Sequence, residues 1–474
     1  MTSKPILQPT LAWLPILALG LLSLLLALLN LGSLLRLVFP AGALATAIWL
    51  YLRYPVLYVG FTWWIWFLSP WVRRMADFLG GWQDPSPVLL TPFLVTFVSG
   101  ATLIRQLPYL SLKGGLPFLM AITATFYGLL MGITNGASLT ALVTSFLYWS
   151  VPVLFGFHLY TNWQEYPQQR TLIYRCFLWG VLVMGSYGLY QYLVAPGWDR
   201  YWMINSEMPV IGSPEPLQIR VFSTLNSPGP FAQVLSAGLI LLLSNSKLLQ
   251  APASLVGYLS LMLSLARSAW IGWVLSLLTL LSASRARLQM RLAVTVVILS
   301  LMVVPLTMVE PFSEVISARV QSLTNPEEDT SLNERMETYN NSLDLIATQG
   351  LGSGLGVVSR DSRLVLDSGL LELLFGMGWF GSIPYLLGLG TLFIRSFRRP
   401  PPDAFVNSVR SISLGTMLTV LLGNVLIGMP GMIVWAFLSL GLSGMQYSSR
   451  AERQKTVASH TAENLALSKS LRST

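Results

Sequence analysis

The chain has 474 residues, of which 53% are hydrophobic and only 10% are charged, with a formal net charge of +9. Soluble proteins carry about 25% charged residues, so this composition excludes an ordinary soluble domain and indicates an integral membrane protein. Most Lys and Arg lie in short segments between apolar runs, where they set membrane orientation, so the charge does not indicate nucleic-acid binding. The single cysteine, Cys176, excludes an internal disulfide and a cysteine-based metal site.

Long apolar runs follow one another along the chain and alternating amphipathic strands are absent, so the spans are predicted to be helices. The first run, 11–35, is too long for a signal peptide, and we interpret it as a retained span. At about 20 residues a span, the chain forms an all-α polytopic bundle of about 12–14 transmembrane helices. The predicted spans are 11–33, 36–52, 55–72, 86–104, 116–133, 138–159, 174–194, 228–244, 251–265, 268–283, 292–309, 368–394, 409–427 and 430–446.

Basic residues between the spans predict on which side of the membrane each connection lies. The densest groups occupy 285–291, 395–399 and the tail at 450–455, which are therefore expected in the cytoplasm. Counting spans from these groups places 197–226 and 310–367 on the outer side. The predicted divisions are an N-terminal transmembrane bundle (1–309), a large extracytoplasmic loop (310–367), C-terminal transmembrane helices (368–446) and a disordered cytoplasmic tail (447–474).

One basic pair disagrees with this orientation. Arg73 and Arg74 fall on the outer side when about 14 spans are counted. Either a span within 36–72 is miscounted or the pair has a function, and we favour the miscount.

The longest polar interval lies between the spans that end at 309 and begin at 368. It is predicted to contain an amphipathic helix, because apolar residues recur there at helical spacing: Leu332, Met336, Tyr339, Leu343 and Ile346. Arg335, Tyr339 and Ser342 share a neighbouring face of this helix. The GLGSGLG run from Gly350 is predicted to be a flexible turn, and without a preceding strand it is weak evidence for a nucleotide loop.

Arginines gather on the predicted outer side, where orientation statistics expect few of them. Arg220 lies eight residues before Pro228, where a span begins, and Arg267 interrupts apolar sequence between two short spans. Such a costly position indicates a functional site; the alternative is that the side chain reaches lipid headgroups. The outer set comprises Arg220, Arg267, Arg335, Arg360 and Arg363, with Asp361, Asp367 and Glu372 close by.

This set of arginines suits a membrane-bound anion such as a lipid-linked pyrophosphate. Each guanidinium group can bind phosphate through two parallel N–H bonds, and it stays charged in any environment. No Asp-x-Asp pair occurs in the outer segments, and both histidines, His158 and His460, fall on the inner side. No metal site is therefore predicted, and the acidic run at 327–329 is interpreted as a solvated loop.

Several of these motifs occur together in one known family. RVFSTLNSP runs into one span and SLARSAW opens a later one; the outer loop then carries R-x-x-x-Y and G-x-G-x-G before a polar pair and a span with LLFGMGWFG. In this order, residues 170–446 resemble the O-antigen ligase and polymerase superfamily. The resemblance implies a C-type fold and an inverting glycosyltransferase that needs no metal or cofactor. It would transfer a glycan from polyprenyl pyrophosphate to an acceptor glycan at the outer face of the inner membrane.

The resemblance also assigns roles to individual residues. Arg220 and Arg267 look like the family's two functional arginines, and Arg335 resembles the one that opens its loop helix. Asp367-Ser368 stands where ligases carry His-Asn, and similar polymerases often carry Asp there, which favours a polymerase. The candidate catalytic residues are thus Asp367, Arg267 and Arg220, and the candidate substrate-binding residues are Arg335, Tyr339, Arg360, Arg363 and Glu372.

The role of Asp367 stays open between three possibilities. A carboxylate with a pKa of about 4 is a weak base, so we expect it to orient the acceptor hydroxyl rather than to deprotonate it. A plain helix N-cap is the structural alternative, because Asp commonly precedes an apolar helix.

The main alternative function is a transporter of a small anion or of the lipid-linked glycan, since arginines in spans also serve anion pathways. A transporter favours two halves related by a repeat, and no such symmetry is visible in the sequence. A non-catalytic assembly subunit is the third possibility.

Overall fold

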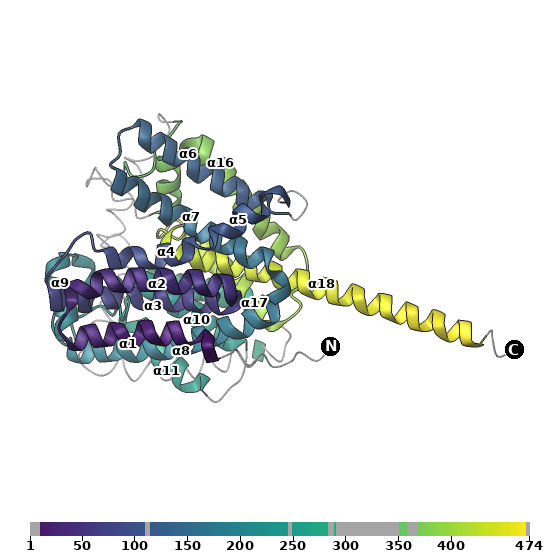
Figure 1. The fold of residues 1–474 in the computed structure, drawn as a ribbon, viewed down its shortest axis with the longest axis horizontal. Coiled ribbons are helices and arrows are strands. Elements are labelled where there is room, and N and C mark those ends of the chain that lie inside the picture. Colours follow the sequence, from purple (N-terminus) through teal and green to yellow (C-terminus); the bar gives the residue numbers. More distant parts are fainter. Residues whose placement is uncertain are drawn as a thin grey trace.

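The computed structural model describes residues 10–109, 114–244, 249–282, 289–290, 350–357 and 368–470, and these segments form a bundle of helices (Figure 1). Within these ranges, extended pairing is limited to one isolated bridge between Gly212 and Ile219. Seven described helical segments are long and apolar enough to cross a membrane, and three shorter apolar helices accompany them. The prediction of an all-α polytopic membrane protein is therefore confirmed.

Most helices overlap the predicted spans, but the helix at Pro55–Gly80 runs beyond the predicted limit of 72 and that at Tyr166–Val194 begins before 174. In the first half they are α1 (Leu14–Leu28), α2 (Gly32–Arg53), α3 (Pro55–Gly80), α4 (Thr91–Phe97), α5 (Gly100–Gln106), α6 (Leu116–Thr134), α7 (Leu139–Thr161), α8 (Tyr166–Val194) and α9 (Gly197–Ser206). In the second half they are α10 (Pro228–Leu243), α11 (Gln250–Leu263), α12 (Arg267–Ser282), α16 (Gly369–Phe397), α17 (Ala404–Met417) and α18 (Gly428–Ser470). Short 3-10 helices are η1 (Thr10–Ala12), η2 (Pro87–Leu90), η3 (Leu107–Tyr109), η4 (Trp163–Glu165) and η5 (Pro209–Ile211).

Proline explains where several of these helices start. It occupies the first turn of α1, α3, α4, α6, α8 and α10. A proline there costs no hydrogen bond, because the first N–H groups of a helix have no partner within the helix. In α17 the start is instead fixed by Asp403, whose Oδ1 accepts a 2.8 Å hydrogen bond from the N–H of Val406.

Two expectations about the C-terminal part of the chain are wrong. The span predicted at 409–427 is instead α17 (Ala404–Met417), followed by a non-helical connection through 427. The tail predicted to be disordered continues α18 as a helix to Ser470. Residues 447–470 contain no Gly or Pro and many good helix formers, so the helix has no local reason to stop. The predicted span at 292–309 and most of the loop at 310–367 lie outside the described residues.

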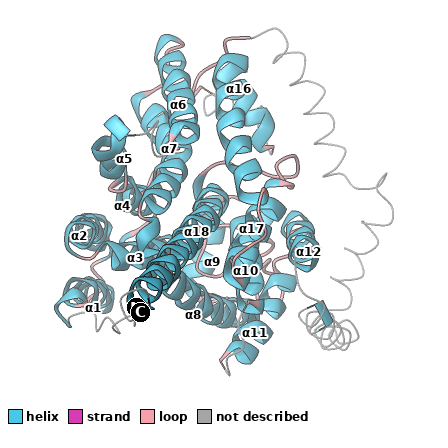
Figure 2. Cartoon of the chain, turned by 90° about the vertical axis from the view of Figure 1, so that its right-hand side faces the viewer, coloured by secondary structure: helices cyan, strands magenta, loops and turns pink. Residues whose placement is uncertain are grey.

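The C-terminal helices pack directly against the N-terminal ones. α18 lies against α7 and α17, α16 lies against α6, and α17 lies against α12. Figure 2 shows α18 crossing the middle of this arrangement. Every residue from Met432 to Leu438 is fully buried, so α18 is the central helix of the bundle.

Contacts between the connections divide the bundle into two ends. At one end Arg170 pairs with Asp403 at 2.9 Å, and Arg399 lies 3.4 Å from the hydroxyl of Ser449. The C-terminal part of α18 projects from this end, and α9 lies at the opposite end beside the end of α3 (Figure 1). This grouping separates the basic connections from the 197–226 segment, as the orientation prediction requires.

Cysteine labelling tests this division. Glu215, at the α9 end, and Glu452, on α18, are both exposed, whereas the single native cysteine, Cys176, is buried. In membrane vesicles we expect an impermeant thiol reagent to label Glu215→Cys and Glu452→Cys from opposite sides. Labelling of both variants from the same side would contradict the predicted orientation.

Candidate functional site

The connection between α9 and α10 carries Arg220 and has little regular structure. Its backbone is instead tied to three neighbouring elements. The N–H of Leu217 donates to the carbonyl of Tyr192 at 2.8 Å, that of Arg220 to Ile211 at 2.9 Å, and that of Val221 to Leu263 at 3.1 Å. The backbone at Arg220 is therefore fixed against η5 and the ends of α8 and α11.

Arg220 reaches from this connection to the turn that precedes Arg267. Its Nη2 donates to the carbonyl of Leu265 at 3.0 Å, and its Nε donates to that of Ser264 at 3.4 Å. Arg267 begins α12 two residues later, and both arginine side chains are half-buried. The structure thus brings together the two arginines that the sequence analysis selected from separate motifs.

Helix N-termini add to the positive charge at this end. α10 begins at Pro228, seven residues after Val221, and it packs against α12, which begins at Arg267. The N-terminus of a helix carries free N–H groups and a partial positive charge, which favour bound anions. Two half-buried guanidinium groups at the N-terminus of α12 form a surface suited to a phosphate or pyrophosphate group.

Glu372 lies at the same end, in the first turn of α16. The connection after α17 holds this helix start, because the N–H of Gly369 donates to the carbonyls of Val420 at 3.0 Å and Gly423 at 3.2 Å. The Glu372 side chain is half-buried and interacts electrostatically with Tyr148 of α7. It therefore faces the inside of the bundle.

The other candidates fall outside the described residues. These are Asp367, Arg335, Tyr339, Arg360 and Arg363. Asp367 directly precedes Ser368, whose buried side chain donates to the carbonyl of Val420 at 3.3 Å. Among the described ranges, no three His, Cys, Asp or Glu side chains gather as they would around a metal ion.

The glycine-rich run at 350–356 is packed rather than free, so the expectation of a flexible turn is wrong. The N–H of Leu355 donates to the carbonyl of Gly128 in α6 at 2.9 Å, and that of Gly354 to Gly376 in α16 at 3.0 Å. A Cβ on Gly354 would lie 2.1 Å from the backbone nitrogen of Gly132. Glycine is required here because the run fills the narrow space between α6 and α16.

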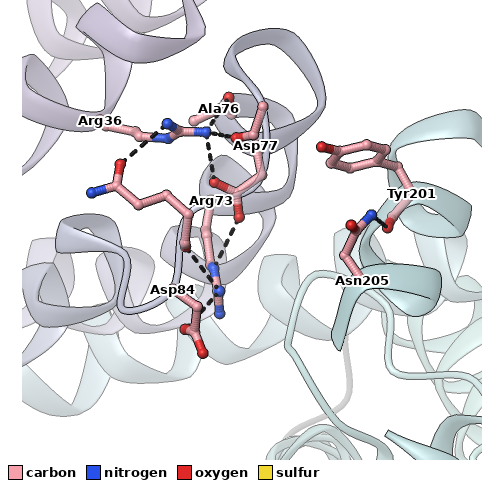
Figure 3. Close-up of polar contacts among 9 residues, drawn as sticks. Arg36, Arg73, Ala76, Asp77, Asp84, Tyr201 and Asn205 are labelled. Atoms are coloured by element: carbon pink, nitrogen blue, oxygen red, sulfur yellow. Dashed lines mark hydrogen bonds and ion pairs between the residues drawn. The ribbon is translucent and has the colours of Figure 1, made fainter. Parts of the chain in front are cut away.

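Sequence reasoning missed a polar cluster at the end of α3. Figure 3 shows Asp77 between two arginines, at 3.0 Å from Arg36 and 3.1 Å from Arg73, while Arg73 also pairs with Asp84 at 3.1 Å. Tyr201 of α9 is directed toward this cluster in the same view. The four-residue spacing of Arg73 and Asp77 is the signal that could have indicated the pair.

Arg74 lies beside this cluster and contacts the connection that carries Arg220. It forms an ion pair with Asp199 of α9 at 2.8 Å, and both side chains are completely buried. The explanation that we favoured, a miscounted span within 36–72, is therefore wrong. α2 and α3 are separate helices, and Arg73 and Arg74 lie at the Arg220 end.

Residues 252–386 match a family model described as O-antigen ligase. The matched segment includes Arg267 and Glu372, and Arg220 lies before it. No curated protein and no solved structure matches the chain.

A glycine substitution tests the local geometry at Arg220. Gly212 has φ of +84° and ψ of −164°, and a Cβ there would lie 2.4 Å from the carbonyl oxygen of Gln218. Gly212→Ala should therefore destabilise the connection by roughly 1–3 kcal/mol and speed trypsin cleavage after Arg220. The control is Gly229→Ala, where a Cβ meets nothing within 4 Å and cleavage should be unchanged. Equal cleavage of the two variants would show that Gly212 does not fix this segment.

Proposed function

We propose that this chain, which matches an O-antigen ligase family model over residues 252–386, polymerises or ligates glycans supplied on polyprenyl pyrophosphate. The observation that carries the proposal is the contact between Arg220 and the turn that leads into Arg267, at one end of a membrane bundle. These arginines come from separate helical connections. Binding of a membrane-bound anion would explain why two positive charges lie so close together.

In the proposed reaction an acceptor hydroxyl oxygen attacks the anomeric carbon of the donor sugar. The bond from that carbon to the phosphate oxygen breaks, and its electron pair leaves with polyprenyl pyrophosphate. The hydroxyl proton passes to a base. A single displacement of this kind inverts the anomeric configuration.

Arg220 and Arg267 are proposed to stabilise the negative charge that grows on the leaving pyrophosphate. Fixed cations lower the barrier most when they are already held in place before the charge develops. The carbonyl bonds from Arg220 to the 264–265 turn supply such a fixed geometry. Free N–H groups at the start of α12 act in the same direction.

Asp367 is proposed to orient the acceptor hydroxyl. It directly precedes Ser368 and a helix start that Val420 and Gly423 fix by backbone hydrogen bonds. Its identity, where ligases carry His, favours a polymerase over a ligase. Glu372, which faces the bundle interior one turn further along, is the next carboxylate to test.

The basic connections favour an outer location for the Arg220 end, so the reaction is proposed to occur at the extracytoplasmic face of the inner membrane. The acceptor glycan would then approach from the outer aqueous side while the polyprenyl chain stays in the bilayer. A transporter would move its substrate without releasing polyprenyl pyrophosphate, which separates the two functions in one assay.

The first functional prediction concerns the arginines. In proteoliposomes that contain a polyprenyl-pyrophosphate oligosaccharide, the protein should release polyprenyl pyrophosphate and lengthen the glycan. Arg220→Lys and Arg267→Lys should each lose about 1.5–3 kcal/mol of leaving-group stabilisation, because one ammonium cannot replace the guanidinium fork. This loss corresponds to roughly a ten- to hundredfold slower release.

Arg170→Lys is the control, since Arg170 forms a partly exposed ion pair at the opposite end of the bundle. It should react at the normal rate. Normal rates for both Arg220→Lys and Arg267→Lys would mean that these side chains serve lipid contact or folding rather than the reaction.

The second functional prediction separates catalysis from helix capping at Asp367. Asn caps a helix nearly as well as Asp, so a capping role predicts normal glycan lengthening by Asp367→Asn. A carboxylate that orients the acceptor predicts a folded protein with most of that activity lost. Asp403→Asn is the matched control, because Asp403 caps α17 at the opposite end. Full activity of Asp367→Asn would remove this residue from the mechanism.

A further inference from the structure

Arg74 forms one ion pair and two hydrogen bonds, so each of its three guanidinium nitrogens lies against a different oxygen. Its Nε pairs with Asp199, its Nη1 donates to the carbonyl of Leu225 and its Nη2 donates to that of Ser223. The side chain is fully buried, and its guanidinium also lies 5.0 Å from the centre of the Phe222 ring. One side chain of α3 thus binds the segment 222–225, whose carbonyls at Ser223 and Leu225 lie 149 and 151 residues further along the chain.

The partners of Arg74 are held in turn by α8. Gln191 donates to Asp199 at 2.7 Å, and its Oε1 accepts from the N–H groups of Phe222 at 3.1 Å and Ser223 at 2.8 Å. Tyr187 also donates to Asp199 at 2.8 Å. Both α8 donors reach Oδ2 of the carboxylate and Arg74 lies at its Oδ1, so α8 and α3 together fix Asp199.

The segment 222–225 lies between Arg220 and the start of α10. Ser223 within it has φ of +51°, a conformation that a non-glycine residue adopts only when its surroundings impose it. Arg74 and Gln191 bond to the backbone of Ser223, and its own hydroxyl donates to the carbonyl of Met184 at 2.6 Å, so these contacts supply the constraint. The contact with α3 thus adds, on the α10 side of Arg220, to the backbone bonds that hold Arg220 against η5, α8 and α11.

We propose that Arg74 and Asp199 are positioning residues for the reaction, which hold 222–225 so that Arg220 and the N-terminus of α10 face the leaving pyrophosphate. The proposal rests on the proposed function. Neither side chain touches the substrate, because both are completely buried. Their effect on the reaction passes through Arg220.

The neighbouring pair Arg73 and Asp77 offers a matched control. It is also a buried ion pair on α3, with side chains 6% and 0% exposed and a separation of 3.1 Å. It holds Arg36 and the 81–84 turn rather than the connection that carries Arg220. Arg73→Lys and Arg74→Lys therefore make the same chemical change next to each other with different consequences.

Turnover of the lipid-linked donor provides the first measurement. Arg74→Lys keeps the charge but presents a single nitrogen to three acceptors, so kcat should fall roughly ten- to a hundredfold while KM for the acceptor stays unchanged. Arg73→Lys should keep the normal kcat. Adding Arg74→Lys to Arg220→Lys should slow the reaction by less than about twofold more, because the two residues act through one group. Independent, additive losses would overturn the proposal.

Amide hydrogen exchange provides a second measurement that does not depend on activity. The N–H groups of Phe222 and Ser223 should exchange roughly tenfold faster in Arg74→Lys and at the normal rate in Arg73→Lys. Unchanged exchange in Arg74→Lys would overturn the positioning role. If exchange is faster in Arg74→Lys but the unaltered protein never releases polyprenyl pyrophosphate, the proposed function is wrong. The contact of Arg74 with 222–225 would still be supported.

Discussion

The burial of Arg74 is the constraint on which the Arg220 end of the bundle depends. An arginine keeps its charge in any surroundings, and a buried one must find acceptors for its nitrogens or destabilise the fold. Arg74 forms an ion pair with a carboxylate of α9 and hydrogen bonds to two carbonyls of the irregular connection before α10. Because the charge cannot be left unpaired, folding of α3 into the bundle fixes the conformation of that connection.

The same rule of complete pairing explains why an irregular segment is stable at the edge of a membrane. Backbone groups without a helix partner must bond to something else where water is scarce. In 207–227 they bond to η5, to the ends of α8 and α11, and to Gln191. The segment is therefore a rigid part of the scaffold, which is what a site that stabilises developing charge requires.

Sequence patterns predicted the parts of the fold that depend on local composition. The spans follow from apolar runs of membrane length, and Arg220 and Arg267 attract attention because arginine is costly at those positions. The contacts of Arg74 could not be predicted, because its acceptors are carbonyls, which any residue supplies, at a point about 150 residues further along the chain. The packing of 350–356 was missed for a related reason: glycine is typical both of free turns and of close backbone contacts.

The most direct measurement of the central claim is the position of a bound donor. A structure of the protein in lipid nanodiscs with a polyprenyl pyrophosphate should show the pyrophosphate at the guanidinium groups of Arg220 and Arg267, near the start of α12. The Arg74–Asp199 pair should remain closed and out of contact with the ligand. A pyrophosphate bound at the opposite end of the bundle, beside Arg170 and Arg395, would contradict the account.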